Sequence, residues 1–273
     1  MEKDALLTNL LTRTELLRAV ELLGPQGQMD ARKSKKLAEV AGFCELIIEY
    51  VRRHLRGKDP VSIVEFSCGK SYLGVVLVTL LKELEGRQCR LTGVDMNAGL
   101  IEKCRLVAER AGLPDARFVA SRTLRFTQEE GCDLVVALHA CDTATDEAIA
   151  RGIQMSAPLI LAVPCCQNQI RGQIKSGHPL AAMTEFGPIR YRLADMLTDA
   201  LRAQFLRSAG YHVEMREISS PRLTPKNLCI AARKVKRKLK GGRDEGYRAL
   251  KALFGVQMKL ENFCPGIIGD EQH

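Results

Sequence analysis

The sequence predicts an α/β fold in which a doubly wound, mostly parallel sheet of seven strands ends in an antiparallel hairpin. Short runs rich in β-branched residues alternate with helical patterns from residue 61 onward. Most of these runs are apolar throughout, which is typical of parallel strands covered on both faces. The last two runs are separated by only about ten residues, too few for a helical crossover, so they are expected to form a hairpin.

The spacing of apolar residues places each element of this sheet. Strands are expected at residues 61–66, 90–94, 116–120, 132–138, 158–163, 211–217 and 227–235. The helices that cover them are expected at residues 71–85, 98–112, 143–153 and 189–209.

An N-terminal helical extension, residues 1–56, is expected before the sheet. Leucines at helical spacing predict one amphipathic helix over residues 3–23 and a second helix over residues 37–55. The main domain is then expected to cover residues 57–240. A short helix near residues 244–254 is expected within the C-terminal segment, residues 241–273.

Composition indicates a globular protein with reduced thiols. The chain has 273 residues, of which 46% are hydrophobic and 27% charged. Its ten cysteines include no CxxC pair, which disfavours a secreted disulfide scaffold and favours a cytoplasmic location. No apolar run reaches about 18 residues, and the first residues do not resemble a signal peptide. A membrane partner is therefore not expected, and the oligomeric state stays open.

The charge balance favours a polyanionic partner. The formal net charge is +9, and two basic segments, Arg32–Lys36 and Arg233–Arg243, flank the core in sequence. Lysine and arginine neutralise phosphates, so RNA is the expected partner of these segments. The alternative is that these charges only keep the protein soluble.

The first strand and its turn predict a nucleotide-type ligand. Glu65 ends an apolar run, and a small-residue turn with Ser67 and Gly69 leads into a helix, as at sites where a backbone approaches a ligand. Asp95 ends the next strand, where a carboxylate can accept both hydroxyls of a ribose. The alternative is that Asp95 and Asn97 only cap the following helix.

Two later segments complete a family resemblance. Leu138-His139-Ala140-Cys141-Asp142 follows the fourth strand, and Pro164-Cys165-Cys166 follows the fifth. With the turn after Glu65 and the Gly93-Val94-Asp95 strand end, these motifs resemble class I S-adenosylmethionine (SAM)-dependent methyltransferases, specifically the tRNA 2′-O-methyltransferase and methyltransferase-like group. The resemblance covers roughly residues 36–235. Ser71 stands where the family usually has glycine, and Gln167 where relatives often carry histidine.

The resemblance implies a Rossmann-like sheet that holds SAM as cofactor. The residues that it places near SAM are Glu65, Ser67, Gly69, Asp95, Asn97, Ser121, Arg122, Thr123, Leu138 and His139. Among them, Ser121, Arg122 and Thr123 are expected near the adenine, and Leu138 and His139 near the methionine end.

Catalysis is expected where the fourth and fifth strands end. The candidate residues are His139, Cys141, Asp142, Cys165 and Cys166. His139 is the candidate general base, since imidazole titrates near neutral pH, but it can equally be structural. The cysteines can be nucleophiles for methylation of a pyrimidine ring, metal ligands or small packing residues. Adjacent cysteines chelate one tetrahedral ion poorly, so no metal is expected.

The sequence thus predicts a SAM-dependent methyltransferase that acts on RNA, with the modified atom undecided. One alternative is a methyltransferase for a protein or a small molecule. Another is a subunit that binds SAM and does no chemistry, because no catalytic motif in the sequence is decisive.

Overall fold

A computed structural model describes residues 5–24, 26–128, 130–175, 177–220, 224, 226–235 and 244–269. Its centre is one seven-stranded sheet with the order β3-β2-β1-β4-β5-β7-β6. The strands are β1 (Val61–Phe66), β2 (Cys89–Asp95), β3 (Arg117–Ala120), β4 (Leu134–Leu138), β5 (Leu159–Val163), β6 (Tyr211–Glu217) and β7 (Leu228–Lys234). Every expected strand is present, with bounds shifted by at most two residues.

The pairing confirms the predicted topology. Strands β1 to β5 are parallel to one another, whereas β7 is antiparallel to both β5 and β6. The chain first builds outward from β1 to β3 and then returns to place β4 on the other side of β1. That reversal is a topological switch point, beside which ligands bind in open α/β sheets.

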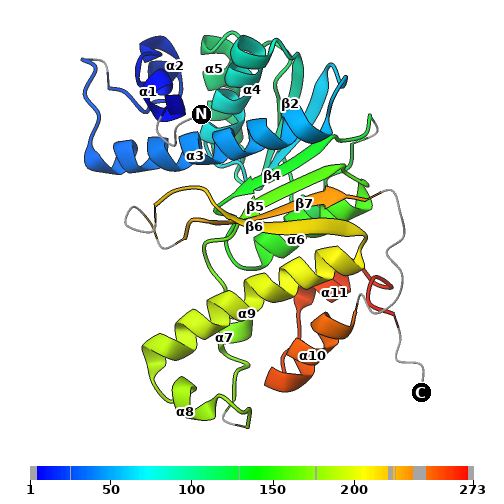
Figure 1. Ribbon diagram of the computed structural model, residues 1–273. Helices are drawn as coiled ribbons and strands as arrows, with labels where there is room; N and C mark the ends of the chain where they lie inside the picture. The colour runs from blue at the N-terminus through cyan, green and yellow to red at the C-terminus, as the bar shows by residue number, and fades with distance from the viewer. Residues whose placement is uncertain are drawn as a thin grey trace.

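Helices cover both faces of the sheet (Figure 1). One face carries α3 (Ala31–His54), α4 (Tyr72–Glu85) and α5 (Ala98–Arg110), and the other carries α6 (Thr143–Gln154) and α9 (Gly187–Ser208). Two hydrophobic clusters match these two layers. The continuous apolar strands are therefore buried on both sides, as their sequences predict.

The N-terminal segment differs from the expected single helix. It forms α1 (Ala5–Leu11) and α2 (Thr14–Ala19). The break has a local cause: the Thr12 hydroxyl donates to the Asn9 carbonyl, and the Arg13 guanidinium donates to the Asn9 side chain. Such bonds compete with helix propagation.

The next helix, α3, begins six residues earlier than expected. The Asp30 side chain accepts a hydrogen bond from the Lys33 amide and caps it, so the basic residues 32–36 lie in its first two turns. The buried side chains of α3 share a cluster with β1 and α4. The domain boundary after residue 56 stays a prediction.

Short helices also occur where none was expected. These are η1 (Thr123–Arg125), α7 (Asn168–Arg171), α8 (Ala181–Thr184) and α11 (Lys259–Phe263). The predicted helix of the C-terminal segment is α10 (Glu245–Phe254). Among the described helices, none combines the length and apolar character needed to cross a bilayer.

Candidate active site

The candidate site lies along one edge of the sheet. Parallel strands end at the same edge, so the turns after β1, β2, β3, β4 and β5 meet there. Because β7 is antiparallel to these strands, the segment that precedes it, with Thr224 and Lys226, reaches this edge as well. The predicted site residues are therefore neighbours, although they span a hundred positions of sequence.

The turn after β1 has an unusual backbone. Ser67, Gly69 and Ser71 all have positive φ, at 52°, 55° and 49°. Only glycine adopts this region freely, and the two serines each cost about 1 kcal/mol or more. An added Cβ on Gly69 would have no heavy atom within 4 Å, so the peptide faces open space. This turn thus presents bare backbone to a ligand.

Glu65 lies beneath the turn and is 3% exposed. Its Oε2 accepts hydrogen bonds from the Ser71 hydroxyl at 2.5 Å and from the Gly74 amide at 3.2 Å. A Cβ on Gly74 would stand 2.4 Å from the same oxygen, so only glycine fits there. Burial raises the pKa of Glu65 to about 7, although these hydrogen bonds and Lys36 oppose the rise.

Asp95 joins the turn after β1 to the end of β2. Its Oδ2 accepts from the Gly69 amide and its Oδ1 from the Asn97 amide, both at 2.9 Å. A carboxylate offers about four acceptor sites, so two remain for a ligand. Asn97 caps α5 through Leu100, which supports the capping interpretation for Asn97. The Ser121 amide bonds to the Asp95 carbonyl, which places Ser121 beside this carboxylate.

The segment after β3 continues this part of the edge. Arg122 follows Ser121 and is exposed, whereas Thr123 opens η1 and is buried. Of the residues expected near the adenine, Ser121 and Arg122 are the two with accessible side chains.

His139 follows Leu138, the last residue of β4, with φ at 59°. Its Nε2 lies 3.1 Å from Oε2 of Glu39 on α3. Burial alone would raise the pKa of Glu39, but the hydrogen bond to His139 and nearby positive charges lower it. An ionised Glu39 assigns the imidazole proton to Nε2. That leaves Nδ1 as an acceptor, and this atom is buried with no hydrogen-bond partner in the described chain.

Lys36 points inward from the same helix. It lies 4.0 Å from Glu39 and interacts electrostatically with Glu65 and Cys165. Burial lowers its pKa, which the nearby carboxylates of Glu39 and Glu65 oppose. Lys36 thus adds a positive charge near the carboxylates of Glu39 and Glu65. Sequence reasoning missed Glu39 and assigned Lys36 to a surface patch.

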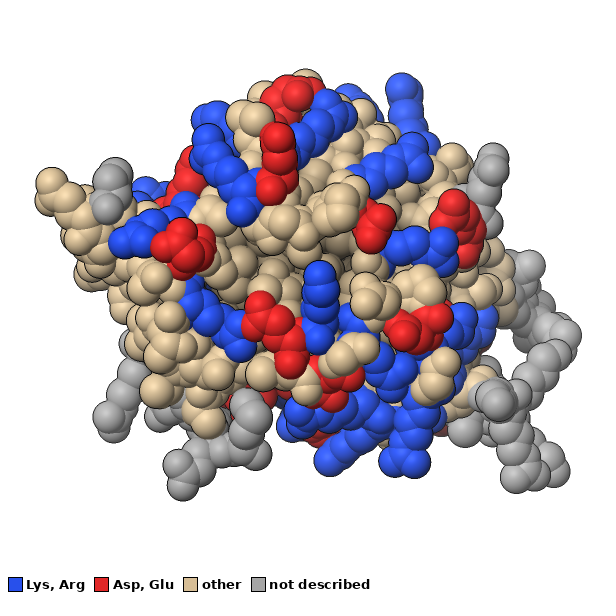
Figure 2. Space-filling model, turned by 90° about the horizontal axis from the view of Figure 1, so that it is seen from above, with Lys and Arg blue, Asp and Glu red and all other residues tan. Residues whose placement is uncertain are grey.

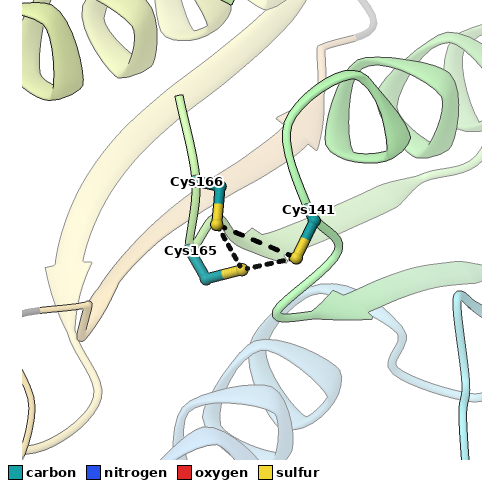
Figure 3. A group of neighbouring side chains, drawn as sticks. All are labelled: Cys141, Cys165 and Cys166. Atoms are coloured by element: carbon teal, nitrogen blue, oxygen red, sulfur yellow. Dashed lines mark hydrogen bonds between the residues drawn. The ribbon is translucent and has the colours of Figure 1, made fainter. Parts of the chain in front are cut away.

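Three thiols converge beyond His139 (Figure 3). Cys141 follows β4, and Cys165 and Cys166 follow β5; Cys141 Sγ lies 3.2 Å from Cys165 Sγ. Burial raises the pKa of Cys165, and the neighbouring thiols add to the rise. This environment disfavours Cys165 as a free thiolate nucleophile. Asp142 holds the two loops together, since its carboxylate accepts from the Gln169 amide at 3.0 Å.

A buried polar network supports these loops from below. Arg202 on α9 is fully buried and donates to Asp146 at 2.7 Å, to Asp199 at 3.0 Å and to the Asp142 carbonyl at 2.8 Å. Gln167 donates to Asp199 and accepts from Lys226, which extends the network to β7. Gln167 therefore has a bracing role at a position where the resembling family often has histidine.

The basic segments lie at different edges. Arg32 and Lys35 are exposed on the first turns of α3, next to Lys36. Arg233 and Lys234 end β7, opposite the start of β5, so they lie at the edge away from the site. Residues 236–243 lie outside the described residues. Figure 2 shows basic and acidic side chains interspersed over most of the face seen from above, with a group of basic side chains gathered along the lower edge of the view.

Comparisons with known proteins show the family and the fold to which this chain is similar. The profile of a protein family described as a methyltransferase domain matches residues 35–173. Magnesium protoporphyrin IX methyltransferase from Synechocystis PCC 6803, solved with bound SAH, has a similar fold with a TM-score of 0.51. At 11% identity, that likeness covers 82% of this chain and 94% of the other.

Curated relatives share part of the sequence. A glutathione S-transferase C-terminal domain-containing protein from Mus musculus is 30% identical over 124 residues, which is 45% of this chain and 18% of that protein. Its Homo sapiens counterpart is 25% identical over 199 residues, which is 64% of this chain and 30% of that protein. The chain thus matches less than a third of the length of these relatives.

Proposed function

Because the chain belongs to the methyltransferase-domain family, we propose that it transfers a methyl group from SAM to RNA. The observation that carries the cofactor assignment is the cradle at the switch point. There, the bare backbone of Gly69 and the half-satisfied carboxylate of Asp95 adjoin open space. SAM supplies an electrophilic methyl carbon on a sulfonium, so the protein mainly has to position the acceptor and remove a proton.

The charged groups of the site fit the two ends of SAM. Asp95 has acceptor capacity for the ribose hydroxyls, and Ser121 beside it is near the place expected for the base. At the other end, the methionine portion carries one ammonium and one carboxylate. Glu65 and Lys36 are a carboxylate and an ammonium that lie close enough to interact with each other. Glu65 can pair with the ammonium of SAM, and Lys36 can pair with its carboxylate.

His139 is the candidate base for the acceptor. Its Nε2 is held by Glu39 at 3.1 Å, and its Nδ1 keeps an unshared acceptor site. A base oriented by a carboxylate is the arrangement that general-base catalysis uses. In this assignment Glu39 is a positioning residue, because it acts on the acceptor only through His139.

The charge of the chain favours a polyanionic acceptor. The net charge is +9, and two exposed basic residues lie near Lys36: Lys35 precedes it directly, and Arg32 lies about one helical turn before it. A phosphate backbone that approached the site along α3 would meet these side chains first. The segment that begins at Arg233 is a weaker candidate, since it starts at the opposite edge.

A labelling experiment tests the activity and its substrate class together. The purified protein is incubated with methyl-labelled SAM and an extract that lacks this protein, and the label is followed after RNase or protease treatment. We expect the label to be lost to RNase. Label removed only by protease, or confined to small molecules, would replace RNA with that class. No transfer from any extract would support a subunit that binds SAM without catalysis.

A charge-reversal experiment tests the route of RNA binding. Arg32→Glu with Lys35→Glu should weaken RNA binding and flatten its salt dependence, because fewer counterions are released. Lys234→Glu, an exposed lysine at the opposite edge, is the matched control and should keep the wild-type slope. If only Lys234→Glu flattens the slope, RNA binds at the other edge of the sheet.

A further inference from the structure

The three thiols at the carboxyl edge have no part in the proposed methyl transfer. Their sulfur atoms all lie within 4.8 Å of one another. Within the part of the chain that the structure describes, no other group of three or more His, Cys, Asp or Glu side chains is as close. The other seven cysteines are buried, and among them only Cys68 and Cys104 are known to interact with each other in the described part of the chain. This cluster therefore requires its own explanation.

The sulfur spacing is close to that of a metal thiolate site. Zinc binds thiolates at about 2.3 Å, so the corners of its tetrahedron lie about 3.8 Å apart. Here the separations are 3.8 Å for Cys141 with Cys166, 3.7 Å for Cys165 with Cys166 and 3.2 Å for Cys141 with Cys165. Adjacent cysteines seldom share one ion, but Figure 3 shows both side chains turned toward Cys141. Only the distance between the sulfur atoms of Cys141 and Cys165 has to increase for an ion to bind.

The backbone holds this arrangement in advance. The His139 amide donates to the Val163 carbonyl at 2.9 Å, and the Asp142 amide donates to the Cys166 carbonyl at 3.2 Å. The two loops are thus cross-linked on both sides of Cys141. His139 and Asp142 also have positive φ, at 59° and 50°, which non-glycine residues adopt at a cost. Such conformations concentrate at ligand sites.

The surroundings suit a site with one open coordination position. Cys141 is exposed and the other two cysteines are partly exposed, so an ion can enter from solvent. Three thiolates and one zinc ion carry a net charge of −1, which the positive charge of Lys36, in electrostatic interaction with Cys165, would offset. Sites with three protein ligands and a free fourth position are those in which zinc binds water or a substrate.

We propose that Cys141, Cys165 and Cys166 bind one Zn²⁺ ion as thiolates, with a solvent molecule as the fourth ligand. Binding forms three Zn–S bonds and releases three thiol protons to the solvent, without any change of oxidation state. The ion would sit beside His139, at the end of the sheet where the acceptor is expected. Sequence spacing alone does not predict this site, because Cys141 lies 24 residues before Cys165.

Metal titration of the full-length protein tests the proposal. The reduced protein is freed of metal and titrated with Zn²⁺ against a chromophoric chelator, and in parallel with Co²⁺, which takes the same tetrahedral ligands and absorbs visible light. We expect one Zn²⁺ per chain, and a cobalt spectrum with thiolate charge-transfer and tetrahedral bands. Cys141→Ser, Cys165→Ser and Cys166→Ser should each weaken binding by more than the roughly 10–100-fold typical of outer-sphere changes.

Cys89→Ser is the matched control. Cys89 opens β2 at the opposite edge of the sheet, so this variant should bind Zn²⁺ with wild-type affinity. Circular dichroism confirms that each variant is folded. Wild-type affinity in all three cluster variants would overturn the proposal. So would a wild-type protein that binds no Zn²⁺ after full reduction, which also opens any Cys141–Cys165 disulfide formed during isolation.

SAM binding by the metal-free protein separates this inference from the proposed function. A protein that binds SAM and methylates RNA but not Zn²⁺ overturns only the metal site. A protein that binds Zn²⁺ through the three cysteines but has no methyl transfer overturns only the proposed function.

Discussion

Replacing Glu65 with glutamine should change how the stability of the protein depends on pH. Glu65 is buried beneath the turn after β1, and burial raises its pKa from an ordinary value of 4.5 to about 7. The folded state therefore prefers the protonated carboxyl. Its contribution to stability is complete below about pH 4.5 and falls as the pH rises through 7.

The size of the effect follows from these two pKa values. Each pKa unit corresponds to 1.36 kcal/mol, so the interval between 4.5 and about 7 amounts to about 3 kcal/mol. Glutamine stays neutral and can still accept hydrogen bonds from the Ser71 hydroxyl and the Gly74 amide. Glu65→Gln should therefore match the wild type near pH 4.5 and exceed its unfolding free energy by up to about 3 kcal/mol at pH 8.

Urea denaturation followed by circular dichroism, at several pH values between 4.5 and 8, measures this difference. Subtracting the two proteins at each pH cancels the contributions of all other groups. Glu102→Gln, an exposed glutamate on α5, is the control and should follow the wild type throughout. If Glu65→Gln and the wild type give parallel curves across this range, Glu65 is ionised in the folded protein and our account of its burial is wrong.

Three further substitutions test the rest of the site. Asp95→Ala should weaken SAM binding in calorimetry by roughly 1.5–3 kcal/mol for each lost hydrogen bond to a charged group, whereas the exposed Asp115→Ala should not; equal affinities would defeat the ribose assignment. Glu39→Gln should lower kcat and shift its pH profile while the KM for SAM is kept, because the tautomer of His139 is no longer held; an unchanged profile would make the pair structural. Arg202→Met should cost about 3–5 kcal/mol in urea denaturation, since it leaves two buried carboxylates unpaired; a cost below about 1 kcal/mol would mean that they are protonated.

The sheet was predictable because its strands are buried on both faces. Runs such as residues 61–66 and 159–163 are buried along their whole length, so they can be recognised as strands without deciding which face points to the core. The turn after β1 was predictable for a related reason. Gly69 indicates a residue with positive φ. Position 71 also has a positive φ, which accounts for the glycine that the family usually has there in place of Ser71. Its hydroxyl adds a hydrogen bond to Glu65 that glycine lacks.

The thiol cluster was only partly predictable. The sequence placed Cys141, Cys165 and Cys166 at the ends of neighbouring strands, and so close to one another. Whether adjacent cysteines point to the same side depends on the backbone of one loop, which no composition or periodicity reveals. The backbone bonds of His139 and Asp142 decide it, and they join residues that are more than twenty positions apart.

The position of Lys36 shows why one missed helix start changed the functional assignment. With a helix beginning at Leu37, Lys36 belongs to a solvated basic stretch. With the start at Ala31, Lys36 and Glu39 lie one turn apart on the face of α3 that Val40 and Phe43 continue into the core. The face of α3 that packs on the sheet therefore extends beyond the edge of the sheet. At that end it carries the ammonium of Lys36 and the carboxylate of Glu39. Lys35 and Lys36 are consecutive, and the turn of the helix directs their side chains to different sides. The same basic run can therefore serve both the cofactor and a polyanionic acceptor.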